Sequence, residues 1–269
     1  MKPLGWLGHA LVAIMLTVLT QVGGAIYLSA LFVRGRVPVL TSRPLVSLAA
    51  VFIGLYALTW FPIEAAAAAT GRVGLPCLER GALRVASPIY CLAHRHYVSR
   101  EMHALAGDLA RSVEKRYPGT LTLTLDANFP FFDGFPMLPH LSHDDGEKLD
   151  VAFYYARVGD GEYARGVLRS PIGYWAFEQP RAVERQPCRG RSSALRWDQH
   201  WFQPFARDDL ALEGRRLTTA LLWLERDGRA RRAFLESHLV DRLDLNAHFV
   251  RFQGCNAARH DDHFHIELR

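Results

Sequence analysis

Three histidines stand within six positions of one another in the segment RHDDHFHIELR: His260, His263 and His265. The apolar alternation that follows His263 predicts a strand, and a strand would project His263, His265 and Glu267 from the same face. Imidazole nitrogens are among the usual ligands of zinc. This segment therefore predicts one part of a metal site.

A second cluster, in PHLSHDDGEKLD, offers His140, His143 and Asp150, and Gly146 permits a tight turn between His143 and the carboxylate. Two histidines and one carboxylate leave the fourth position of a tetrahedral zinc site open for water, which is typical of catalytic zinc. His140 would be an extra ligand, a hydrogen-bond partner of a ligand, or a polar loop residue. A single histidine is more often solvated or hydrogen-bonded, but five histidines in two short clusters favour a metal site.

The two clusters have the forms S-H-x-x-G-x-x-x-D and H-x-x-H-x-H. In this order they resemble the penicillin-insensitive murein endopeptidases, which are zinc peptidases related to lysostaphin-type endopeptidases and D-Ala-D-Ala metallopeptidases, with a hedgehog-like fold. The resemblance is concentrated in these motifs, with a looser echo in RRAFLESHLVDRL (231–243). It implies a zinc metallopeptidase that hydrolyses peptide bonds of peptidoglycan through a metal-activated water.

The resemblance also assigns roles to residues. His143, Asp150 and His265 would bind Zn²⁺, while His263 and His260 would be catalytic residues that do not bind it. The chemistry agrees with these roles, because zinc lowers the pKa of its water to about 7. An unligated imidazole beside that water can accept its proton or stabilise the oxyanion.

Two alternatives stay open. One is a D,D- or L,D-carboxypeptidase of the same zinc class, which would trim stem peptides; the loop 128–139, rich in Phe and Pro, would decide this specificity. The other is a non-catalytic, zinc-stabilised module that binds peptidoglycan or has a regulatory role. The presence of both His263 and His260 favours an enzyme.

The elements that must position these residues are expected from periodicity. Strands first and last, with helices between them, predict an α+β domain around a mostly antiparallel sheet with flanking helices. The expected helices are 99–116, 216–226 and 231–243; the expected strands are 120–127, 148–156, one or two within 163–177, 248–252 and 263–268.

The amino-terminal part holds two runs without charged residues, 4–33 and 45–63. Each is about as long as the roughly 20 residues that cross a bilayer, which predicts a transmembrane helical hairpin over 1–70, with helices at about 5–33 and 45–66. The first run is too long for a cleaved signal peptide and lacks its small-residue site. Residues 71–98 would be a lead-in, and 99–269 the zinc peptidase domain.

Arginines in the short connector, Arg34, Arg36 and Arg43, place it in the cytoplasm by the positive-inside rule. The expected localisation is the inner (cytoplasmic) membrane, with the catalytic domain in the periplasm or outside the cell. The partners would then be peptidoglycan and the lipid bilayer. Nucleic acid is excluded as a partner on that side, despite the net charge of +5.

The four cysteines all lie in the part expected outside the cytoplasm, where two disulfides can form. We expect Cys77 to pair with Cys91, because the two are close in sequence. Four buried free thiols are the alternative. None belongs to a C-x-x-C pair, so a cysteine-based zinc or redox site is not indicated.

Overall fold

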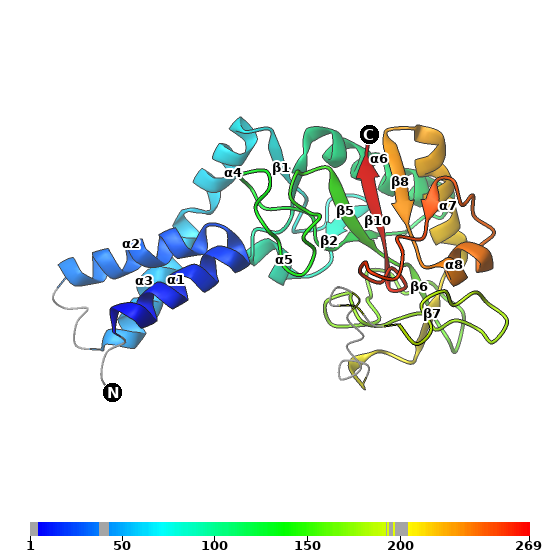
Figure 1. The fold of residues 1–269 in the computed structure, drawn as a ribbon. Helices are drawn as coiled ribbons and strands as arrows, with labels where there is room; N and C mark the ends of the chain where they lie inside the picture. Colours follow the sequence, from blue (N-terminus) through cyan, green and yellow to red (C-terminus); the bar gives the residue numbers. More distant parts are fainter. Residues whose placement is uncertain (1–4, 38–42, 192, 194–195, 197–203) are drawn as a thin grey trace.

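A six-stranded mixed sheet forms the centre of the protein (Figure 1). The computed structural model describes residues 5–37, 43–191, 193, 196 and 204–269. In spatial order the strands are β2 (Leu83–Val85), β4 (Thr122–Thr124), β5 (Lys148–Ala152), β10 (His263–Leu268), β8 (Ala230–Phe234) and β9 (Val250–Arg251). The three inner pairings are antiparallel, whereas β2 with β4 and β8 with β9 are parallel. The α+β class is therefore as expected, but the sheet is mixed.

Two amphipathic helices pack on this sheet, α6 (Arg100–Arg116) beside β2 and α7 (Gly214–Asp227) beside β8. In α6 the buried residues recur every three or four positions, which places Met102, Leu105 and Leu109 on one stripe. The hydroxyl of Ser99 caps this helix by accepting from the backbone N–H of Met102 at 3.2 Å. Phe264 of β10 belongs to the same apolar core.

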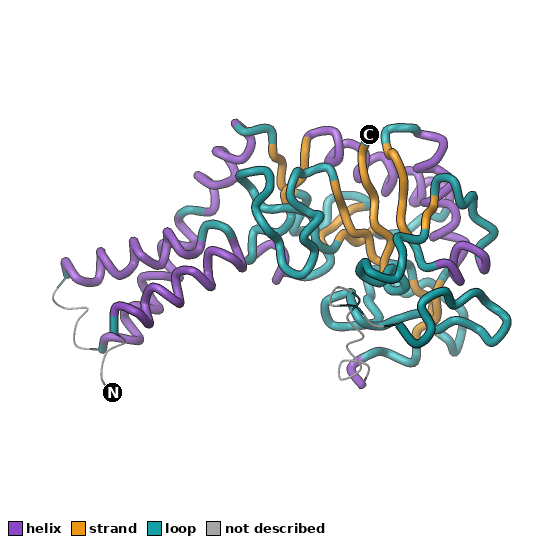
Figure 2. The backbone as a smooth tube through the Cα atoms, viewed as in Figure 1, coloured by secondary structure: helices purple, strands orange, loops and turns teal. Residues whose placement is uncertain are grey.

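Two smaller sheets and two short helices complete the body: β1 (Arg72–Gly74) with β3 (Tyr97–Ser99), β6 (Tyr155–Arg157) with β7 (Leu210–Leu212), α5 (Pro88–Leu92) and α8 (Ser237–Arg242). Figure 2 shows how much of the remainder is loop. The stretch 71–98, expected as a lead-in, contributes β1, β2, α5 and β3 to the folded body.

Two expectations about the elements are wrong. The stretch 231–243, expected as one helix, is the end of strand β8 followed by α8, because Phe234 and Ala233 pair with β10 and are buried there. Tertiary pairing has overridden a helical spacing. The stretch 163–177 contains no strand, apart from one isolated bridge at Tyr163, and turns at Gly166 and Gly173, which have positive φ, account for its path.

The expected transmembrane hairpin is also wrong. Each apolar run is divided, the first into α1 (Trp6–Thr20) and α2 (Gly23–Arg36), the second into α3 (Pro44–Leu58) and α4 (Trp60–Ala69). Within the described residues, no single helix has the length and apolar character needed to cross a bilayer; α3 and α4 reach it only as a pair, bent by 42°. Helices α1, α2 and α3 lie side by side and extend from the body (Figure 1).

The break in the first run has a physical cause. Gln21 ends α1 with φ of 65°, and its side-chain amide donates to the carbonyl of Phe131 at 2.6 Å and accepts from the N–H of Phe131 at 2.8 Å. A polar side chain thereby ties the turn to the body. The two glycines that follow lie where a Cβ would meet α1, so their absence of side chains lets α2 fold back onto it.

Both cysteine pairs are disulfides, Cys77–Cys91 and Cys188–Cys255, and the expected pairing of Cys77 with Cys91 is confirmed. The first closes the loop that carries β2 and α5. The second joins two segments that are 67 residues apart in sequence. Chain crosslinks of this kind stabilise the folded state by restricting the unfolded one.

Candidate metal centre

The two histidine clusters meet at the middle of the sheet. In the register of β5 against β10, His265 lies directly opposite Asp150, so both side chains project from the same face. His263, two residues along the strand, shares that face. His143 comes from the loop before β5, which turns at Gly146 with φ of 79°. Strand pairing thus brings together residues 115 positions apart.

Three potential ligand atoms converge there. Asp150 Oδ1 lies 2.7 Å from His265 Nδ1 and 3.3 Å from His143 Nε2, and the two nitrogens are 3.1 Å apart. Ligand atoms of a tetrahedral zinc site, at about 2.0–2.1 Å from the metal, lie about 3.3 Å from one another. The three atoms therefore have nearly the spacing that a zinc ion requires.

The protonation states of these side chains also favour the binding of a metal cation. His143 Nδ1 lies 2.7 Å from the carbonyl oxygen of Ala127, so this nitrogen carries the proton and Nε2 presents a lone pair to the centre. Burial lowers the pKa of His143, so that its imidazole stays neutral. Burial alone would raise the pKa of Asp150, but the neighbouring imidazoles, the charged ring of His263 among them, outweigh it and hold that pKa well below its ordinary value. The site therefore offers a carboxylate and a neutral imidazole to a metal ion.

The imidazole of His265 has a carboxylate behind it. His265 Nε2 points away from the centre and lies 3.8 Å from Glu267 Oε1, and within the described part of the chain it makes no hydrogen bond. Glu267 itself forms an ion pair with Arg232 at 2.5 Å. A carboxylate on the outer nitrogen of a ligand histidine favours the tautomer that binds the metal.

His263 is oriented beside the trio without belonging to it. Its Nδ1 lies 2.5 Å from Asp262 Oδ1, and its Nε2 lies 3.6 Å from Asp150 Oδ2. Burial disfavours the imidazolium, but the carboxylates of Asp150 and Asp262 outweigh burial and raise the pKa of His263 to about 9. A carboxylate that fixes the outer nitrogen of a histidine is the arrangement of a positioned acid or base.

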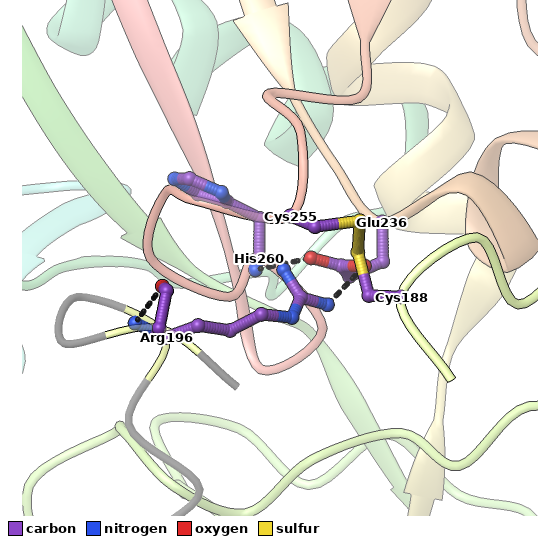
Figure 3. The surroundings of a disulfide bond; sticks show 6 residues. Cys188, Arg196, Glu236, Cys255 and His260 are labelled. Carbon is purple, nitrogen blue, oxygen red and sulfur yellow. Dashed lines mark hydrogen bonds and ion pairs between the residues drawn. A yellow bond between two sulfur atoms is a disulfide. The ribbon is translucent and has the colours of Figure 1, made fainter. Parts of the chain in front are cut away.

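His260 lies next to His263, with ring centroids 5.0 Å apart, and is buried. Its backbone is fixed on both sides by Glu236, whose N–H donates to the carbonyl of His260 at 3.0 Å and whose carboxylate accepts from the N–H of His260 at 3.4 Å. Arg196 pairs with the same carboxylate at 2.8 Å, close to the disulfide of Cys188 (Figure 3). Burial, reinforced by the other imidazoles, holds the pKa of His260 well below its ordinary value.

His140 occupies the remaining side of Asp150. Its Nδ1 lies 3.3 Å from Asp150 Oδ2 and 3.0 Å from Asp126 Oδ2. His140, His143 and Asp150 offer ligand atoms that all lie within 4.8 Å of one another, which marks them as a group that could hold a metal ion. The hydroxyl of Tyr174 donates to Asp150 Oδ2 at 2.6 Å and completes the surroundings of this oxygen.

Every residue that the sequence assigned to the site is therefore found in one cluster. Sequence reasoning did not select Tyr174, Asp126 or Asp262. Asp262 is adjacent to His263, but a carboxylate in a turn is more often solvated. Tyr174 and Asp126 stand outside both motifs and gave no signal.

A second group with metal-ligand spacing consists of Cys77, Cys91 and His96, but the disulfide between the two cysteines leaves no free thiol there to bind a metal.

The centre opens into a cavity of about 340 Å³, which is lined by His143, Asp150 and the three carboxyl-terminal histidines, His260, His263 and His265. The candidate metal-binding side chains are therefore accessible from this cavity. Comparison with known proteins gave no support for any identity: no protein-family model matches the chain, and no curated protein matches it significantly.

Proposed function

We propose that the chain is a zinc metallopeptidase that hydrolyses peptide bonds of peptidoglycan, in the manner of a murein endopeptidase. The observation that carries this proposal is the convergence of His143 Nε2, Asp150 Oδ1 and His265 Nδ1 within 3.3 Å of one another, beside an open cavity. Three protein ligands and one open position are the arrangement of catalytic rather than structural zinc.

Zinc, when bound, would supply a Lewis acid that lowers the pKa of water to about 7. The residues of the chain supply the rest. Asp262 holds His263 by Nδ1, which leaves Nε2 directed at the ligand side of the centre, where the protonated ring can donate to the oxyanion or give its proton to the leaving amine. His260, neutral and buried, is placed to donate a ring N–H hydrogen bond to the developing oxyanion.

The substrate class rests on the two motifs, since they resemble those of murein endopeptidases. A carboxypeptidase of the same zinc class would use the same side chains, so the bond that is cut is left to experiment. The two disulfides support a location outside the cytoplasm, where such bonds persist and where peptidoglycan lies.

A lipid surface is proposed as the second partner. Large apolar side chains on the helices that extend from the body are exposed, among them Trp6, Leu11 and Phe32, while Arg34 and Arg36 end α2 with charge suited to anionic head groups. Sedimentation of the full chain with anionic phospholipid vesicles tests this. A chain that stays in the supernatant contradicts it.

Metal content and digestion of purified peptidoglycan test the main proposal. The full chain should bind one zinc and release fragments whose masses identify the bond. His143→Ala, Asp150→Ala and His265→Ala should each lose zinc and activity, whereas His248→Ala, an exposed histidine outside the cluster, should keep both. Unchanged zinc in a folded His143→Ala protein contradicts the ligand assignment. Zinc binding without released fragments favours the non-catalytic module.

A further inference from the structure

A larger cavity, of about 470 Å³, adjoins the metal cavity. The two have Pro139, His140, Ala258 and His263 in their common lining. A group that occupies the larger cavity would therefore lie directly beside the reacting centre. No part of the proposed peptide hydrolysis explains this space.

The wall of the larger cavity is mainly apolar. Leu19 comes from the end of α1, and Ile89 and Leu92 come from α5. Trp175 and Phe177 come from the long segment between β6 and β7. Ile89 and Leu92 are 55% and 60% exposed, respectively. Apolar side chains left this exposed in a concave site indicate that something covers them.

The charged side chains in this wall are already paired. Arg95 forms two hydrogen bonds with Asp126, at 2.6 and 2.7 Å, and Asp262 accepts from the backbone N–H of Trp175 and lies against His263. A carboxylate or ammonium group entering here would have to break one of these pairs. Charged ligands are therefore disfavoured in this cavity.

The remaining arginine of the wall is also paired. Arg259 forms two hydrogen bonds with Asp261, and its guanidinium lies over the ring of Phe177 at 3.7 Å from the ring centre. A carboxyl-terminal carboxylate bound next to the scissile bond would need a cation that is available to it. The paired state of both arginines favours a substrate whose group in this cavity is uncharged.

We propose that this cavity is a binding site for an uncharged, apolar group that the substrate carries next to the bond to be cut. This inference rests on the proposed function, because it assigns a part of the substrate to a place beside the same metal centre. The group is either an apolar side chain of the peptide or the acyl chain of a lipid attached to it. Leu19 gives α1 a direct place in the wall.

A series of straight-chain hydroxamic acids tests this on the zinc-loaded full chain. The hydroxamate binds the metal, and the alkyl chain extends from acetohydroxamate to decanohydroxamate. Burial of one methylene contributes about 0.8 kcal/mol, so calorimetry should show affinity rising about fourfold for each methylene that enters the cavity. A rise that ends at four to six carbons identifies a side-chain site, and one that continues to ten identifies an acyl-chain site.

Two controls make the test specific. The monohydroxamate of octanedioic acid, with a carboxylate at the far end, should bind more weakly than octanohydroxamate. In Ile89→Asp and Leu92→Asp the affinity should no longer rise with the length of the alkyl chain. The zinc content should stay unchanged, since both side chains are exposed and outside the ligand set. Val158→Asp, 62% exposed and outside the lining, should leave the series as in the original protein.

A flat series in the original protein overturns the inference, as does a chain to which none of the hydroxamates binds. A series that rises equally in Ile89→Asp overturns it too, because the alkyl chain would then lie elsewhere. The outcome is independent of the proposed substrate: a rising series in a protein that releases nothing from peptidoglycan keeps the apolar site and rejects peptidoglycan as the substrate.

Discussion

Acid should destabilise the protein through two histidines at the junction of the amino-terminal helices and the body. His94 and His96 are buried against the ring of Trp60, with ring centroids 4.9 and 5.9 Å away. Within the described residues, neither ring nitrogen of His94 has a hydrogen-bond partner. Burial lowers the pKa of His94 from 6.5 to about 4 and that of His96 to about 3.

The direction of this pH effect follows from the linkage between proton binding and unfolding. A histidine whose pKa is lower in the folded state binds its proton more readily when the chain is unfolded. Its contribution to the free energy of unfolding is therefore complete above pH 6.5 and is lost as the pH falls towards 4. For His94, the difference between 6.5 and about 4 corresponds to about 3 kcal/mol in full. Roughly 2 kcal/mol of this is lost between pH 7 and pH 5.

Urea unfolding followed by tryptophan fluorescence at pH 7 and pH 5 measures this loss. His94→Phe keeps an aromatic ring against Trp60 and removes the titrating group, so its free energy of unfolding should fall by roughly 2 kcal/mol less over this pH range. His248→Phe, at an exposed position, should behave as the original protein. Any strain of the new residue at φ of 54° acts at both pH values and cancels. Equal pH dependence in all three proteins refutes the reasoning.

Three further predictions concern the centre and the helices. His263→Ala should retain zinc but hydrolyse a cross-linked muropeptide about 10²- to 10⁴-fold more slowly, and an unchanged single-turnover rate contradicts the catalytic role. Gly24→Ala should destabilise the protein by about 1–3 kcal/mol, because its Cβ would collide with the Thr17 hydroxyl and the Ala13 carbonyl. Gly54→Ala, where a Cβ would meet no other atom, should instead stabilise the protein by up to about 1 kcal/mol. Equal melting temperatures of the two variants contradict this. Chelation should lower the melting temperature, and free zinc at about 100 times its Kd should restore about 2.7 kcal/mol; indifference to zinc contradicts a metal centre in the folded state.

Local patterns predicted part of the fold well. The strand at 263–268 has the expected bounds, because its alternation is strict and both faces are buried. The helix expected over 99–116 begins one residue later at Arg100, since Ser99 is its cap. The strand β8 was missed because its pairing with β10 is a tertiary contact that spacing along the chain does not contain.

The apolar amino-terminal part shows the limit of hydropathy. Chain length and composition describe 4–33 as one run, yet Gln21 supplies a polar side chain and the glycines at 23 and 24 permit a close return of the helix. Those three residues were a signal for a break, but the partner of Gln21 lies 110 residues away at Phe131. In the same way Tyr174 reaches Asp150 only through the folded sheet, so no motif could identify it.

The placement of β10 between β5 and β8 has a consequence for biosynthesis. His143 and Asp150 are made long before His265, and His265 reaches them only when β10 enters the centre of the sheet. The entropy of closing a loop of more than a hundred residues has to be overcome at that step. A nascent chain that has not yet placed β10 thus lacks His265 at the candidate metal centre, so this centre assembles only together with the completed sheet.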